Sequence, residues 1–134
     1  MTSVFFEDIE PFNVSVDLFS TRISYIIENE GFKEGDIVLI FCSDDYLLDI
    51  NIEHLSHNYY TDIITFPFTY RDNLAGDLYI SIDRVKANAI NENVSFNREL
   101  ERVICHGILH LCGYNDKTDI EITEMRFKEN FYLQ

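Results

Sequence analysis

The sequence predicts a single α+β domain over residues 1–134, with a mixed sheet of about four strands and helices packed on it. Short apolar runs rich in β-branched residues are interspersed with segments whose apolar residues recur at helical spacing. These segments do not follow a strict βαβ repeat, which favours α+β over α/β. No internal repeat, low-complexity tract or linker rich in Pro, Gly or Ser divides the chain.

The first half of the chain is expected to form strand, helix, strand and helix, at residues 4–9, 16–30, 36–42 and 44–55. The first helix has apolar residues at helical spacing, with Ser15 to cap its start and Gly31 to end it. The run DIVLIFC is continuously apolar, which is typical of a buried strand. Ser43, followed by Asp44 and Asp45, predicts the start of the second helix, because acids are favourable at the positive end of a helix.

The second half is expected to form two strands and three helices, at residues 62–68, 76–82, 83–94, 95–112 and 118–131. The second of these strands alternates apolar and polar residues, and the short polar link YRDNLA suits a hairpin-like or edge connection. Pro67 indicates that its strand ends or lies at an edge. Ser95 and Gly113 bound the long helix, and Thr118 with Glu121 predicts a capping box for the last one.

Composition narrows the classes of function. The net charge is −14, which argues against casual binding of nucleic acid. The charge is uneven: residues 1–70 hold 2 Lys or Arg and 13 Asp or Glu, against 8 and 11 in residues 71–134. A polyanion would therefore bind the second half more readily.

No apolar run is long enough to predict a membrane span, and the first residues do not resemble a secretory signal. Three cysteines without a CxxC motif indicate reduced thiols in the cytoplasm.

The stretch HGILHLCGYND, residues 106–116, is the strongest functional signal. His106 and His110 stand one helical turn apart at the edge of the apolar face, so their rings can bind one ion. Gly113 allows the chain to leave the helix and turn back, which brings Asp116 within reach as a third ligand. Three protein ligands leave a fourth position for water, as in catalytic zinc sites. The alternative is an apolar helix with two incidental histidines, followed by Asp116 as a turn or cap residue.

Gly107 bears on both packing and chemistry. Glycine costs about 1 kcal/mol in the middle of a helix, so its place there predicts the close approach of a strand or a substrate. Zinc peptidases carry a general-base Glu at this position. Its absence favours attack on a phosphodiester over peptide hydrolysis. His54 and His57 form a second, weaker histidine pair, which is more typical of a solvated helix end than of a metal site.

Three blocks of the sequence resemble the YbeY family of bacterial metal-dependent endoribonucleases. They are INIEHLSHNYYTDIITFPF at 50–68, AGDLYISIDRVKANA at 75–89 and HGILHLCGYND at 106–116. The resemblance implies a YbeY-like metal-dependent hydrolase domain with Zn²⁺ at His106, His110 and Asp116. It implies a zinc-dependent endoribonuclease that cuts single-stranded rRNA in maturation of the small-subunit rRNA 3′ end and in ribosome quality control, in the cytoplasm and with no membrane partner.

The chain departs from the family pattern at two positions. The last motif position is usually His and is Asp116 here, and a carboxylate is a harder ligand than imidazole. An arginine thought to help with substrate is replaced by Leu55. Arg98, Arg102 and Lys117 flank the motif and are the candidate substitutes, with solvated helix surface as the alternative. The general base, the native metal and the oligomeric state are left open.

Two rival functions remain at this point. One is a metal-dependent hydrolase of another substrate, such as a peptide. The other is a ribosome-associated assembly factor whose metal is structural.

Overall fold

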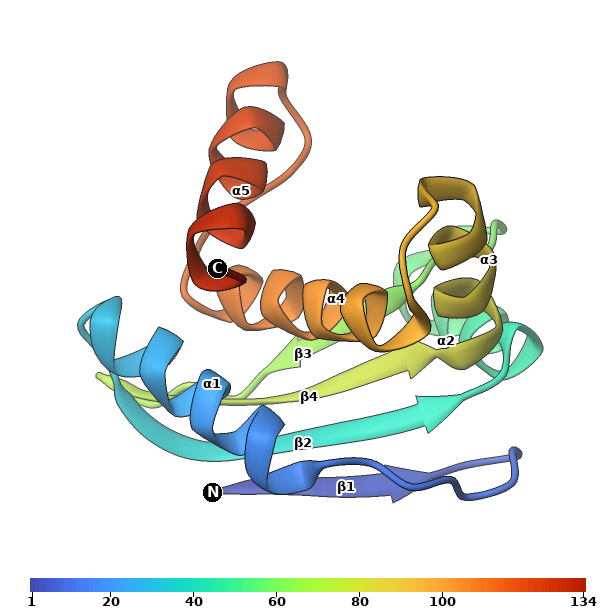
Figure 1. Ribbon diagram of the computed structural model, residues 1–134, viewed down its shortest axis with the longest axis horizontal. Coiled ribbons are helices and arrows are strands. Elements are labelled where there is room, and N and C mark those ends of the chain that lie inside the picture. Colours follow the sequence, from blue (N-terminus) through green and yellow to red (C-terminus); the bar gives the residue numbers. More distant parts are fainter.

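The computed structural model describes residues 1–134 and confirms a single α+β domain with five helices and one mixed sheet of four strands (Figure 1). The elements are, in chain order, β1 (Thr2–Phe6), α1 (Val16–Asn29), β2 (Lys33–Cys42), α2 (Asp44–Leu55), β3 (Ile63–Pro67), β4 (Asn73–Ser81), α3 (Ile82–Glu92), α4 (Phe96–Leu111) and α5 (Asp119–Tyr132).

The strands are ordered β1-β2-β4-β3 across the sheet. The pairs β1–β2 and β2–β4 are parallel, whereas β3 pairs with β4 in the antiparallel direction and forms one edge. The antiparallel pair is joined by a hairpin-like link, as predicted, but the link is shorter than YRDNLA because β4 already begins at Asn73. Tyr70 and Asn73 form an isolated bridge across it. Pro67 is the last residue of the edge strand, as expected for a residue that has no N–H for a ladder.

Helix α4 is the centre of the fold. It contacts β3 and β4 on one side and α1, α3 and α5 on others, and in Figure 1 α5 lies on it away from the sheet. Its apolar face is buried in the main core with residues of the sheet and of α1. A Cβ atom on Gly107 would stand 2.6 Å from Cδ1 of Ile63 and 2.7 Å from Cδ2 of Leu78. The predicted close approach at this glycine is therefore that of two strands.

Most element boundaries agree with the sequence, and the differences have local causes. The first strand spans Thr2–Phe6 and not 4–9. It ends early because Asp8 leaves the ladder and accepts hydrogen bonds from the backbone N and the Oγ of Ser43 at 3.0 and 2.5 Å. Ser15 precedes α1, but its side chain makes no capping hydrogen bond.

The other predicted caps are confirmed. Ser43 Oγ accepts from the N–H of Tyr46, Ser95 Oγ accepts from the N–H of Arg98, and Thr118 forms a complete capping box. Gly31 and Gly113 have φ of +89° and +108°, the left-handed conformation expected of residues that end helices. None of the helices combines the length and the apolar character that crossing a membrane requires.

Candidate metal centre and cleft

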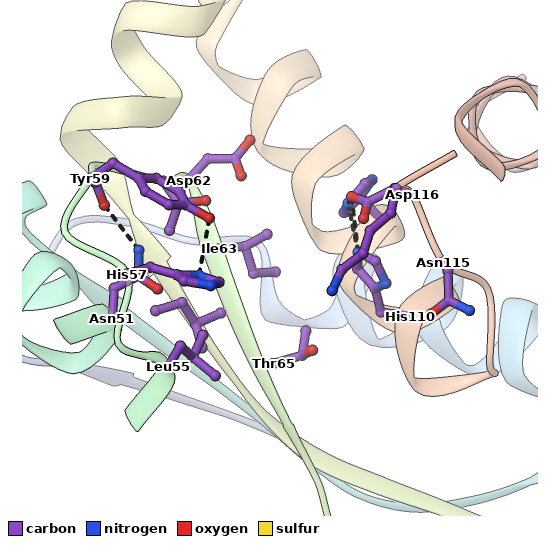
Figure 2. Close-up of a pocket in the computed structure, with 14 residues that line it drawn as sticks. Asn51, Leu55, His57, Tyr59, Asp62, Ile63, Thr65, His110, Asn115 and Asp116 are labelled. Atoms are coloured by element: carbon purple, nitrogen blue, oxygen red, sulfur yellow. Dashed lines mark hydrogen bonds and ion pairs between the residues drawn. The ribbon is translucent and has the colours of Figure 1, made fainter. Parts of the chain in front are cut away.

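Helix α4 and the turn after it bring three donor atoms together. His106 and His110 lie one turn apart on the helix, and their side chains are 18% and 23% exposed. After Gly113 the chain turns back, held by a hydrogen bond from the N–H of Tyr114 to the carbonyl of Leu109 at 3.1 Å. This turn places the carboxylate of Asp116 beside both rings (Figure 2).

The distances within this triad are short. The two Nε2 atoms are 2.9 Å apart, and Oδ2 of Asp116 lies 3.1 Å from Nε2 of His106 and 3.3 Å from Nε2 of His110. Ligands at about 2.0–2.2 Å from a tetrahedral ion stand about 3.3–3.6 Å from one another. The three atoms therefore need to move apart by only a few tenths of an ångström to surround an ion, and these residues can hold a metal.

The other ring nitrogens decide which atoms face the triad. His106 donates from Nδ1 to Oε2 of Glu129 at 2.6 Å, and His110 donates from Nδ1 to the carbonyl oxygen of Tyr114 at 2.9 Å. A neutral imidazole that donates through Nδ1 has its lone pair on Nε2. In their neutral forms, both histidines therefore direct the lone pair of Nε2 toward Asp116, which is the arrangement that a metal requires of its ligands.

Glu129 comes from α5 and is almost fully buried, at 2% exposed. Its second oxygen, Oε1, accepts from Nη1 of Arg102 at 3.3 Å. Arg102 in turn holds the buried Glu99 through two hydrogen bonds of 2.9 and 2.6 Å. Glu99, Arg102 and His106 occur three and four residues apart on α4, so this ionic chain follows one stripe of the helix. Glu129, which is 23 positions after His106 in the sequence, therefore orients the ring of His106.

The charges of these ionic side chains alter the pKa values of Glu129 and His106. Burial alone would raise the pKa of Glu129, but the hydrogen bond and charge of His106, together with Arg102, bring it below its usual value. Burial alone would lower the pKa of His106, but the hydrogen bond to Glu129 and the nearby carboxylates raise it. The pair is therefore stabilised in its charged, hydrogen-bonded form when only the protein's own groups act on it.

The triad opens into a cleft of about 410 Å³ between α2, β3 and the turn after α4. In Figure 2, Asn51, Leu55, His57 and Tyr59 lie on one wall, His110, Asn115 and Asp116 lie on the other, and Ile63 and Thr65 of β3 lie between them. Asp62 also lines the cleft, and burial raises the pKa of its carboxyl group above the usual value. Apart from Asp116, it is the only carboxylate in the lining.

The three candidate cations lie in different places. Lys117 lines the cleft beside Asp116. Arg98 donates to the carbonyl oxygen of Leu133 at 2.8 Å and lines a separate cavity, which Arg102 also lines. Arg102 is bound to Glu99 and Glu129, and its Nη2 lies 3.7 Å from Asp62, behind the wall of the cleft. The structure therefore brings Lys117 to the triad and places both arginines outside the cleft.

Leu55 and one member of the second histidine pair line the cleft, whereas the other member does not. Leu55 lines the cleft and is 44% exposed, so the position that carries arginine in the resembling family does face the site. His57 lines the cleft too, where its ring stacks on Tyr59. His54 instead packs edge-on against Phe66, with ring centroids 5.6 Å apart. The pair does not converge on a common ligand position with a third donor.

Sequence reasoning missed three contributors to the site: Glu129, Asp62 and Tyr59. A signal existed for Glu129, because it falls on the buried stripe of α5 with Met125 and Tyr132, where a carboxylate needs a partner. Asp62 and Tyr59 carried no such signal, since a polar residue at the start of a predicted strand and an aromatic residue in the loop before it are both ordinary. Their place in the cleft follows only from the packing of α2 and β3.

Known proteins share both the sequence pattern and the fold. A family model described as Endoribonuclease YbeY matches residues 8–134. A protein named endoribonuclease YbeY from Parabacteroides distasonis is 47% identical over 124 residues, which cover 92% of this chain and 87% of the relative. One of the same name from Flavobacterium johnsoniae is 48% identical over 112 residues, covering 84% and 81%.

A solved structure shares the fold of this chain. The solution structure of a protein from Thermotoga maritima superposes with a TM-score of 0.67 at 28% identity, over 99% of this chain and 87% of that one. The family match includes all three residues of the triad and both walls of the cleft.

Proposed function

The chain belongs to the endoribonuclease YbeY family, and from this premise we propose that it is a zinc-dependent endoribonuclease of single-stranded RNA. Its proposed substrate is rRNA, at the 3′ end of the small-subunit rRNA during maturation and in ribosome quality control. The observation that carries the proposal is the convergence of two Nε2 atoms and one carboxylate oxygen at the mouth of a cleft.

The protein's own groups have separable roles in this proposal. His106, His110 and Asp116 are the ligands, and Glu129 and the carbonyl of Tyr114 fix the two rings. A zinc ion held by three ligands supplies a Lewis acid that polarises a phosphodiester and activates water for attack. Lys117 is the one Lys or Arg in the cleft lining, and we assign it to a phosphate next to the triad.

Zinc is proposed over other divalent ions because of the donor set. Two imidazole nitrogens and one carboxylate oxygen, with a fourth position open to solvent, are typical of catalytic zinc. Three free cysteines support a reducing compartment, and we propose that the enzyme acts in the cytoplasm, where ribosomes assemble.

Peptide hydrolysis is disfavoured by Gly107. A glutamate at this position would have to stand between Ile63 and Leu78, where even a Cβ has no room. The general base of the helical zinc peptidases therefore has no equivalent on α4. The second rival, an assembly factor with a structural metal, is the class that the experiment has to separate from the enzyme.

The experiment combines metal binding with cleavage. Zinc affinity is measured by competitive titration of the wild type, Asp116→Asn and Asp116→His, with Asp119→Asn as an exposed control. Asn keeps the shape of Asp but loses its charge, so affinity should fall about tenfold or more, or about 1.4 kcal/mol. Asp116→His should retain zinc, because imidazole is also a zinc ligand.

Cleavage is then tested on a single-stranded rRNA 3′-end fragment, on its duplex and on a peptide. We expect metal-dependent cleavage of the single strand alone, and its loss together with zinc in His110→Ala. Tight RNA binding without cleavage would establish the assembly factor instead. Unchanged zinc affinity in Asp116→Asn would remove Asp116 from the ligand set.

A further inference from the structure

The wall of the cleft that faces the triad is built from an aromatic pair. The rings of His57 and Tyr59 stack with centroids 5.2 Å apart and an angle of 20° between their planes. The hydroxyl of Tyr59 also lies within hydrogen-bonding distance of Nδ1 of His57, at 3.0 Å. Tyr59 is 56% exposed, and Leu55, also exposed, lies beside the pair (Figure 2).

The loop that carries this pair is held in place by hydrogen bonds to Asn51. Asn51 is buried at 1% exposed, and its amide donates to the carbonyl oxygen of Tyr59 at 2.9 Å. The backbone carbonyl oxygen of Asn51 accepts a hydrogen bond from the N–H of His57 at 3.1 Å. One buried residue thus holds the backbone at both aromatic positions, and Ser56, in the left-handed conformation at the end of α2, directs the loop along the cleft. The rings are consequently presented in a fixed place and need little ordering when a ligand binds.

The side-chain charges of the cleft cannot supply most of the affinity for a polyanion. Its lining holds one permanent cation, Lys117, against two carboxylates, Asp62 and Asp116, and the chain as a whole carries −14. Proteins that bind single strands combine contacts to the phosphates with a second source of affinity, which is the stacking of bases on aromatic side chains.

We propose that His57 and Tyr59, with Leu55 beside them, form a stacking platform for an unpaired nucleobase of the RNA strand whose phosphate lies at the triad. The inference rests on the proposed function and adds the recognition of the base to it. An exposed ring accepts the flat face of any base, so the platform selects for unpaired nucleotides and not for sequence. In a duplex the same face is covered by the neighbouring base pair, and the platform therefore gives the enzyme its preference for single strands.

The test compares the wild type with variants at Tyr59 and Tyr70 on two ligands. The proteins are zinc-loaded wild type, Tyr59→Ala and Tyr70→Ala, the last being a tyrosine of similar exposure, 68%, that lies outside the cleft. The ligands are a phosphorothioate single-stranded RNA, which is cleaved slowly, and the same strand with abasic nucleotides. Fluorescence anisotropy gives Kd for each pair.

The wild type should bind the strand with bases about tenfold more tightly than the abasic strand. Tyr59→Ala should lose that preference, with no change for the abasic strand, and Tyr70→Ala should behave as wild type. Tyr59→Phe keeps the ring and should retain the preference. Tyr59 is exposed and does not touch the triad, so thermal stability and zinc affinity should be unchanged in these variants.

The outcomes separate the platform from the nuclease. If Tyr59→Ala keeps the wild-type preference for bases, or if the wild type has none, the platform is wrong, whatever the cleavage assay shows. If natural RNA is not cleaved but the preference depends on Tyr59, the nuclease is wrong and the platform stands as an RNA-binding surface.

Salt dependence gives an independent check. With one phosphate at the zinc-loaded triad and one at Lys117, the slope of log Kd against log salt should be about 1.4, since each phosphate neutralised on a single strand contributes about 0.7. A slope of about 4 or more would show that ion pairs supply the affinity and would overturn the assignment.

Discussion

At the metal centre, each histidine uses one ring nitrogen to contact the protein and directs the other into the cleft. This division depends on the acceptors, the carboxylate of Glu129 for His106 and the carbonyl of Tyr114 for His110. The hydroxyl of Tyr114 in turn donates to Glu30 at 2.6 Å, and Lys128 contacts the same carboxylate at 3.2 Å. The turn that carries the second acceptor is therefore tied to α1 and α5.

Glu129→Gln tests whether the residues behind the ligands control the metal. Gln keeps the length of Glu but loses the charge that favours donation by His106 and that pairs with Arg102. Changes of this kind typically cost about 10- to 100-fold in metal affinity, and we expect a fall of about tenfold in a competitive zinc titration.

Glu124→Gln, an exposed change on the same helix, is the matched control and should bind zinc as the wild type does. The variant at Glu129 should also unfold at a lower temperature, because the partly buried guanidinium of Arg102 loses a charged partner. A lower Tm with unchanged zinc affinity would mean that Glu129 supports the fold and does not position the ligand.

At the scale of elements, the cleft depends on how closely α4 approaches the sheet. Gly107 lies against Ile63 of β3 and Leu78 of β4, and β3 is also the floor of the cleft. The missing side chain thus sets the spacing between the helix that carries two ligands and the strand beneath them. Helix propensity alone would favour any other residue here except proline.

Gly107→Ala should therefore destabilise the protein. Alanine gains about 1 kcal/mol in helix propensity, but inserting a methyl group into this packed contact costs about 1–3 kcal/mol. We expect a net loss of about 1 kcal/mol and a decrease in Tm of about 3–5 °C, measured by thermal unfolding.

A double-mutant cycle with Ile63→Val identifies the cause, because this change removes the Cδ1 atom nearest to the new methyl group. The double variant should be less destabilised than the sum of the single variants. Greater stability of Gly107→Ala alone would show that the helix has room at this position.

At the scale of the whole molecule, the core shields all three cysteines. Cys42 and Cys105 are buried, Cys112 is partly buried, and all three are free. Burial raises the pKa of each thiol to about 12, and acidic neighbours add to this effect at Cys42. The reactive thiolate is therefore scarce in the folded protein at pH 8.

A thiol titration with Ellman's reagent at pH 8 tests this description. The folded protein should react slowly, beginning with the partly exposed Cys112, whereas the unfolded and unreduced protein should release three equivalents at once. A single equivalent after unfolding would reveal a disulfide, and rapid reaction of the folded protein would contradict the burial of the thiols.

Sequence alone determined the features that depend on neighbours along the chain. The periodicity of α4, the caps at Ser43, Ser95 and Thr118, and the turn at Gly113 are all local, and each follows from residues within a few positions. The triad belongs to this class, since its members lie within eleven residues. The family motif was readable for the same reason.

Only the tertiary structure decided the rest of the site. Glu129 meets His106 because α5 packs on α4, and Leu55, His57 and Tyr59 face the triad because the end of α2 lies across β3 from it. Arg102 flanks the motif in sequence, yet buried carboxylates hold it outside the cleft. Local patterns report the conformation of the backbone, whereas the partner of a charge is set by contacts between segments far apart in the chain. Those contacts form where burial of apolar surface brings the segments together. Local sequence patterns do not show which distant segments will pack against each other.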